Sequence, residues 1–242
     1  MNSCRELSPS VLSALLKRER IIFTARFLSG EVHNLSSAIQ MISLPLDLAQ
    51  LAVEQGNGHD MGPRLDSLRQ GLDRLKMEVG LLAKRGLADQ RGEAEPLSLA
   101  RLAVEQLYFW RGDLFCKHEV TQKRRLNQVG GYVKVPYVDA ALALNSLLAN
   151  AVDALRGSRG GWLEVRDFEE DGRRGLAVSD NGAGPSPEMA AGLFEPFVGD
   201  KGEGHDGLGL YLAAKALEPW GGRLAWRAGA PHTTFVMDLP SA

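Results

Sequence analysis

Apolar residues near the start of the chain recur with the 3.6-residue period of an α-helix. Ser8-Pro9 is a favourable helix start, because Ser caps a helix N-terminus and Pro is tolerated in the first turn. The apolar stripe that follows comprises Leu12, Leu15, Ile22, Phe23, Phe27, Leu35, Ile39 and Ile42. We expect one helix to about Gln55, kinked or divided at Pro45, and roughly 70 Å long if it is continuous.

A second helix is predicted from Gly62-Pro63, after the break at Gly56-Asn57-Gly58. Its apolar residues alternate in steps of three and four, the heptad pattern of a coiled coil: Leu65, Leu68, Leu72, Leu75, Val79 and Leu82. A two-helix hairpin cannot bury such a stripe alone. We therefore expect a two-fold homodimer in which two hairpins form a four-helix bundle. The alternative is a hairpin packed against the chain's own C-terminal domain.

The polar segment from Gly86 to Pro96 is predicted to be a boundary between a helical domain, 1–90, and a second domain, 91–242. In the second domain the pattern predicts helices over 97–110, 138–155 and 208–217, and strands over 118–124, 132–135, 162–168, 174–180, 222–227 and 233–239. The turn at 169–172 predicts a β-hairpin. The expected fold class is α+β, with a two-layer α/β sandwich following the helical hairpin.

Composition narrows the classes of partner. The 242 residues are 44% hydrophobic and carry a net charge of -2, which gives no global field to attract nucleic acid or an anionic membrane. Two cysteines are too few for a disulfide framework and match no metal-ligand spacing. We see neither an apolar run that could span a bilayer nor a secretory pattern, so the expected location is the cytoplasm, without membrane insertion.

His33 is the candidate nucleophile of the first domain. Ser37 lies one helical turn further on, where its hydroxyl could orient a water or a phosphoryl group near the ring. Neutral imidazole, with an ordinary pKa of about 6.5, is a competent nucleophile at neutral pH.

Three polar stretches of the second domain are candidates for nucleotide chemistry. On the predicted helix, Asn150 and Asp153 lie three residues apart on one face, and an amide oxygen is a suitable ligand for Mg²⁺. The strand ending at Asp180 runs into Gly182 and Gly184, which let the main chain pass beneath a flat ring. The glycine-rich loop that begins near Lys201 leads into the last helix through Gly207, Leu208, Gly209 and Leu210, and its backbone amides could bind phosphates.

These stretches, in this order, resemble the ATP-binding domain shared by DNA gyrase, the large heat-shock chaperone, sensor histidine kinases and MutL proteins. Asn150-Ala151-Val152-Asp153-Ala154 matches the N box, and Asp180 to Gly184 the first glycine box. Leu193 to Phe197 resembles the F box of histidine kinases, and Gly207 to Leu210 the second glycine box. The resemblance implies that Asn150 binds Mg²⁺ and phosphate, that Asp180 binds the adenine amine, and that 201–209 forms the ATP lid.

The hairpin resembles the dimerisation and histidine phosphotransfer domain of the same kinases, which implies that His33 is the phosphoacceptor. Asn34 stands where that family usually has Glu or Asp, and Asn cannot take a proton, so we predict slowed autophosphorylation. Ser37 replaces the usual Asn or Thr of dephosphorylation. Gly199 and Asp200 replace a Thr-Thr pair in the lid, which brings an acidic group near the phosphates.

The sequence thus predicts a soluble histidine kinase that autophosphorylates His33 from Mg-ATP and passes the phosphoryl group to an Asp of a response-regulator receiver domain. A catalytically weak phosphotransfer or scaffold protein on the same fold is the alternative. An ATP-driven clamp or serine kinase is disfavoured, because Ser146 stands where gyrase and the chaperone have a catalytic Glu. No recognisable sensor fits in the first ten residues, so either a separate sensor protein delivers the signal or the chain is a relay component.

Overall fold

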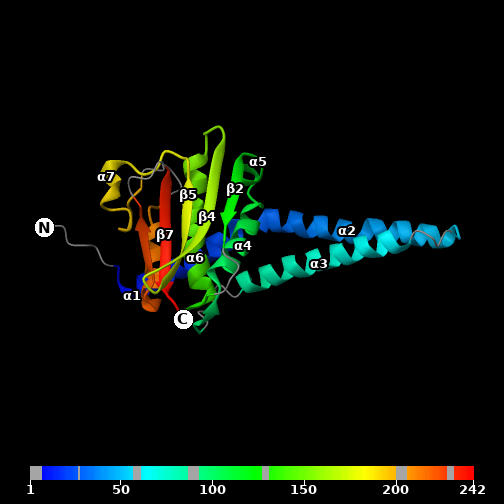
Figure 1. The fold of residues 1–242 in the computed structure, drawn as a ribbon, viewed down its shortest axis with the longest axis horizontal. Coiled ribbons are helices and arrows are strands. Elements are labelled where there is room, and N and C mark those ends of the chain that lie inside the picture. Colours follow the sequence, from blue (N-terminus) through cyan, green and yellow to red (C-terminus); the bar gives the residue numbers. More distant parts are fainter. Residues whose placement is uncertain are drawn as a thin grey trace.

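The computed structural model describes residues 7–26, 28–56, 61–86, 93–126, 131–199, 206–227 and 232–242. A long helical hairpin extends away from a domain of helices and strands, and a further helix runs along that domain (Figure 1). The helices are α1 (Pro9–Arg26), α2 (Leu28–Glu54), α3 (Met61–Gly86), α4 (Leu99–Trp110), α5 (Leu114–His118), α6 (Tyr137–Leu155), α7 (Pro187–Ala190), α8 (Gly209–Leu217) and the 3-10 turn η3 (Glu218–Trp220). The strands are β1 (Glu95–Leu97), β2 (Val120–Arg125), β3 (Val133–Val135), β4 (Gly161–Glu170), β5 (Arg173–Asp180), β6 (Arg223–Trp226) and β7 (Thr233–Pro240).

The hairpin consists of α2 and α3, which pack against each other. The sequence predicts a kink or a division at Pro45. The helix is not divided there, because α2 includes this residue and continues to Glu54, and the kink stays a prediction. Packing along α3 retains the helix although proline removes one backbone hydrogen bond. The stretch from Pro9 to Glu54, which the sequence predicts as one helix, contains the two helices α1 and α2. Residue 27, between them, lies outside the described residues.

The five-stranded sheet has the order β2-β4-β5-β7-β6, in which β2 and β4 are parallel and the other pairs antiparallel. The predicted hairpin is confirmed, since Glu170 pairs with Arg173 across the turn. A helical layer that includes α4, α6 and α8 packs on the sheet, so the expected two-layer α/β sandwich is also confirmed. The sequence prediction lacked α5, α7 and β1, which are too short to show a periodic pattern.

The centre of the core is α6, whose buried residues include Leu144, Leu147 and Leu148. By length and composition α6 could also cross a membrane, contrary to the expectation that no apolar run in the chain could do so. Of this apolar window 67% is buried inside the domain. Its apolar character is therefore accounted for by its place in the core.

The helix α1 packs against α6 and α8 of the sandwich. Leu7, Leu12, Leu15 and Leu16 pack around a cluster of Leu208, Tyr211 and Leu212. A buried ion pair joins Arg20 to Asp139 at the start of α6, and Asp139 also accepts a hydrogen bond of 2.9 Å from the indole Nε1 of Trp220. The part of the predicted apolar stripe that lies on α1 thus packs against the chain's own C-terminal domain. For this part of the stripe, the structure has the arrangement that the sequence analysis gave as the alternative to a four-helix bundle.

Candidate functional site

A cavity of about 500 Å³ lies between α6, the end of β5, the start of α8 and α1. Eight of the candidate residues from the second domain line it: Asn150, Asp153, Asp180, Gly184, Gly207, Leu208, Gly209 and Leu210. Stretches separated by about sixty residues of sequence therefore meet at one place. Apolar side chains such as Met189 and Phe235 complete a lining that suits a ligand with a flat apolar part and a charged part.

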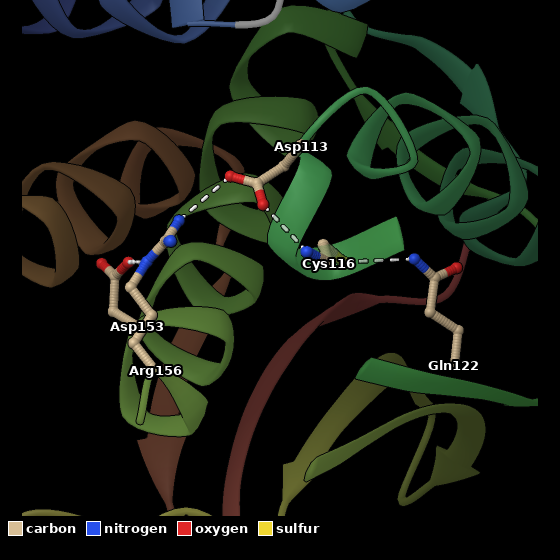
Figure 2. A network of polar contacts seen from close by, with 5 residues as sticks. All are labelled: Asp113, Cys116, Gln122, Asp153 and Arg156. Carbon is tan, nitrogen blue, oxygen red and sulfur yellow. Dashed lines mark hydrogen bonds and ion pairs between the residues drawn. The ribbon is translucent and has the colours of Figure 1, made fainter. Parts of the chain in front are cut away.

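Asn150 and Asp153 lie one turn apart near the C-terminal end of α6, and both are half-buried. The carboxylate of Asp153 pairs with Arg156, whose Nε lies 3.3 Å from Oδ1. The other end of the Arg156 guanidinium binds Asp113 at 3.0 Å (Figure 2). The orientation of Asp153 at the cavity wall is therefore supported by a charge network that continues through Arg156 to Asp113.

Asp180 ends β5 with its side chain only 1% exposed. Its Oδ1 accepts a hydrogen bond of 2.9 Å from the backbone N–H of Gly182, which tightens the turn after the strand. Gly182 does not line the cavity, but a Cβ at this position would lie 2.6 Å from the carbonyl oxygen of Ala154 in α6. A side chain at Gly182 would therefore push the strand end away from the helix that carries Asn150.

The loop before α8 crosses the segment that follows α7 at close range. Gly207 has a φ of +62°, and a Cβ there would lie 2.8 Å from the backbone of Phe197. The backbone N–H of Phe197 donates to the carbonyl of Gly207 at 3.0 Å. Phe197 itself has a φ of 65° and is 59% exposed. This unfavourable backbone conformation at a non-glycine residue is a feature that concentrates at ligand-binding segments.

One wall of the cavity comes from α1, which the sequence prediction did not include. Arg18, Glu19, Ile22 and Phe23 line the cavity, and Arg18 pairs with Asp206 at 3.0 Å. Burial raises the pKa of Glu19 above its ordinary value of 4.5, against the opposing effect of Arg18. No signal in the sequence assigns these residues to the site, because a helical stripe does not reveal its partner.

The remaining candidates are not placed at the cavity by the described residues. His33, Asn34 and Ser37 belong to α2, and Asn34 and Ser37 are not among the described residues that line the cavity. The side chain of His33 lies outside the described residues, as does the whole of Lys201. Their assignment to the site stays a prediction.

Comparisons with known proteins agree with the fold of the second domain. Residues 137–242 match the family model described as "Histidine kinase-, DNA gyrase B-, and HSP90-like ATPase". This matching segment begins with α6 and contains the nucleotide-type motifs. ATP is the cofactor that such a domain supports.

Relatives with a described role are bacterial sensor proteins. The C4-dicarboxylate transport sensor protein DctB of Rhizobium meliloti is 24% identical over 240 residues, which are 96% of this chain and 37% of that protein. The sensory histidine kinase/phosphatase NtrB of Salmonella typhimurium is 32% identical over 107 residues, covering 40% of this chain and 30% of the relative. The chain thus spans about a third of the length of these relatives.

Solved structures show the same fold. The catalytic domain of histidine kinase ThkA has a TM-score of 0.54 at 20% identity and covers 62% of this chain and 96% of its own. Full-length ShkA in complex with AMPPNP has a TM-score of 0.53 at 19% identity and covers 98% of this chain and 46% of its own. These solved structures thus share the fold of this chain.

The donor set of the cavity fits a magnesium ion that is held mainly by its nucleotide. No group of three or more His, Cys, Asp or Glu side chains that could hold a metal occurs in the described parts of the chain. Mg²⁺ in nucleotide sites takes one or two protein oxygens and completes its octahedral shell with phosphate oxygens and water. Asn150 offers one such oxygen at the cavity wall.

Proposed function

We propose that the chain is a histidine kinase of a two-component system that transfers the γ-phosphoryl group of Mg-ATP to His33. An imidazole nitrogen would form a bond to the γ-phosphorus as the bond to the β-phosphate oxygen breaks and ADP leaves. An Asp of a response-regulator receiver domain would then accept the phosphoryl group. The observation that carries this proposal is the convergence of Asn150, Asp180 and the Gly207–Leu210 loop on one cavity.

Each wall of the cavity would have a separate task in nucleotide binding. The carboxylate of Asp180, buried and oriented by the Gly182 N–H, would accept a hydrogen bond from the adenine amine. Asn150 would bind Mg²⁺ and phosphate, with Asp153 beside it. The amides at the start of α8 would bind phosphate oxygens, and Lys201 would supply a point charge to the terminal phosphate. Catalysis would consist mainly of positioning and charge neutralisation.

The phosphoacceptor end of the proposal rests on the position of His33 in α2. Asn34, beside it, can accept a hydrogen bond but not a proton, so autophosphorylation is expected to be slow. Ser37 is half-buried one turn further along and would face the same reaction region.

A homodimer is supported by two rows of exposed apolar residues on the hairpin. On α2, Val32, Ile39, Leu46 and Val53 follow each other at seven-residue spacing and are 55%, 50%, 54% and 65% exposed. On α3, Leu65, Leu72 and Val79 repeat the same spacing with 56%, 44% and 52% exposed. These rows match the seam of a four-helix bundle, so a second copy of the chain is the proposed partner.

The further partners follow from the same proposal. One solved neighbour is the histidine kinase ThkA in complex with the response regulator protein TrrA, with a TM-score of 0.51 at 15% identity. For this chain we propose a receiver domain in the same class, a cytoplasmic location and an input that arrives from a separate sensor protein.

The test is incubation of the full chain with Mg-ATP labelled at the γ-phosphate. We expect acid-labile label in the wild type and in His118→Ala, an exposed histidine at the end of α5, and none in His33→Ala. Absence of label in the wild type would refute the kinase and favour the weak phosphotransfer protein. Label that persists in His33→Ala would refute His33 alone.

The adenine contact has its own test. Asp180→Asn should weaken ATP binding by at least about tenfold, whereas Asp171→Asn in the exposed β4–β5 turn should leave it unchanged. Equal affinities for the two variants would show that Asp180 does not bind adenine.

A further inference from the structure

A second cleft, of about 270 Å³, lies between α4, α5 and β2 and shares no lining residue with the ATP cavity. Three basic residues line it, one from each element: Arg111 after α4, Lys117 in α5 and Arg124 in β2. Among the described lining residues there is no Asp or Glu. The cleft therefore concentrates three positive charges in a chain whose net charge is -2.

The three basic side chains of the cleft form no ion pair with a carboxylate in the described parts of the chain. The two residues that flank Arg124 on β2 do have partners. Arg125 pairs with Glu164 at 3.0 Å, and the Lys123 ammonium lies 4.6 Å from the centre of the Trp162 ring. Because alternate residues of a strand face opposite sides, Arg124 faces the helices and the cleft, whereas Lys123 and Arg125 face the other surface of the sheet.

The acidic residue of the adjacent loop does not neutralise the cleft. Asp113 accepts a hydrogen bond of 2.9 Å from the backbone N–H of Cys116 and binds Arg156 at 3.0 Å on the opposite side (Figure 2). Both oxygens are thereby occupied, and Asp113 is not part of the lining. Asp113 is therefore paired with Arg156 and not with the basic residues of the cleft. The lining residue Tyr108 donates its hydroxyl hydrogen bond to the buried carboxylate of Glu78.

The inner surface of the cleft is uncharged and fixed. Cys116 is 1% exposed, and its sulfur accepts a hydrogen bond of 3.2 Å from Nε2 of Gln122. Burial raises the pKa of the Cys116 thiol, so the sulfur stays protonated and adds no negative charge at neutral pH. Leu107 and Val120 are buried beside it. The three positive groups therefore surround a floor of buried side chains that is already packed in the folded chain.

We propose that this cleft binds a compact anion with two or more negative charges, of the phosphate-ester or polycarboxylate type. Two guanidinium groups can each bind such a group through parallel hydrogen bonds, and the lysine ammonium supplies a further charge. The volume is below the range typical of drug-sized ligands, which favours a small anion over a nucleotide.

The test uses inorganic pyrophosphate and citrate as probes, titrated into the full chain with methyl-labelled leucine and valine. Binding at the cleft should shift the methyl resonances of Val104, Leu107 and Val120 and leave those of Leu208 and Leu210 in the ATP cavity unchanged. Shifts with pyrophosphate alone would identify the phosphate class, and shifts with citrate alone the polycarboxylate class.

A pair of variants one residue apart gives the matched control. Arg124→Gln should weaken binding of the active probe by about fivefold or more, the loss expected for one charge about 4 Å away even in a water-like dielectric. Arg125→Gln removes the same charge from the other face of the sheet and should change the affinity by less than about twofold. Equal weakening by the two variants, shifts confined to the ATP cavity, or no binding of either probe would overturn the proposal.

Discussion

The buried contact between α1 and the sandwich can be tested at Arg20. The Arg20 side chain is 9% exposed, and its guanidinium pairs with the carboxylate of Asp139, whose side chain is fully buried. Arg20→Leu keeps most of the apolar stem but removes the positive charge, while the Trp220 indole continues to donate to Asp139. The variant leaves a buried carboxylate without its ion-pair partner.

Removal of one member of a buried ion pair costs about 3–5 kcal/mol, most of it because the remaining charge is desolvated without compensation. Arg20→Leu should lower the free energy of unfolding by that amount. Arg20→Leu combined with Asp139→Asn should recover most of the loss, because asparagine is neutral and its amide oxygen still accepts from Trp220. Arg18 provides the control: its pair with Asp206 has side chains 55% and 54% exposed, so Arg18→Leu should cost less than about 1 kcal/mol.

The assay is urea unfolding followed by tryptophan fluorescence. The protein concentration is held fixed, because the stability of the proposed dimer would depend on concentration. The expected order of midpoints is wild type and Arg18→Leu highest, the double variant slightly lower and Arg20→Leu lowest. Equal losses for Arg18→Leu and Arg20→Leu, or no recovery in the double variant, would refute the idea that a buried ion pair fixes α1.

Three further variants test other contacts. Gly182→Ala should cost about 1–3 kcal/mol in urea unfolding and weaken ATP binding, because the new Cβ would overlap the Ala154 carbonyl; an unchanged affinity would contradict this. Because the pKa of Glu19 is raised in the folded state, the folded chain binds its proton more tightly than the unfolded chain, so stability falls as pH rises from the ordinary value of 4.5 through the raised one. Glu19→Gln should abolish that part of the pH dependence of the urea midpoint. Burial and the hydrogen bond to Glu78 raise the pKa of Tyr108 to about 12, so this phenol should not contribute to the absorbance titration near pH 10. Tyr108→Phe should lower the free energy of unfolding by about 1–3 kcal/mol, because the buried Glu78 carboxylate loses the hydrogen bond from Tyr108.

Long elements with strong periodicity could be predicted from the sequence. The core helix α6 and the β4–β5 hairpin lie within one or two residues of their predicted bounds, because burial on one face fixes their pattern. The short helix α5 could not be found in this way. Its five residues are too few for a periodic apolar pattern, and its start is fixed by the side chain of Asp113, which caps the N-terminus.

The partner of an amphipathic helix could not be predicted, because a stripe shows only that something covers it. Leu12 and Leu15 belong to the same apolar run as Ile39, yet they pack against α8, whereas Ile39 is 50% exposed. The seven-residue row on α2 was present in the sequence and was not separated from the general helical stripe.

In the ATP cavity too, some residues could be predicted from the sequence and others could not. Asn150 and Asp180 lie in short motifs whose chemistry is specific, so their convergence could be anticipated. The contribution of Arg18 and Phe23 depends on tertiary packing across almost the whole length of the chain, and neither residue type nor spacing indicates it.

The docking of α1 has a practical consequence for work on the isolated sandwich. A fragment cut at the polar boundary after α3 would contain every ATP motif but would uncover Leu208, Tyr211 and Leu212 and remove the ion-pair partner of Asp139. Such a fragment would present an apolar patch to solvent and a cavity that is open on one side. Its solubility and nucleotide affinity would then describe a different binding site from that of the whole chain, unless a peptide spanning Pro9–Arg26 were added to replace the missing wall.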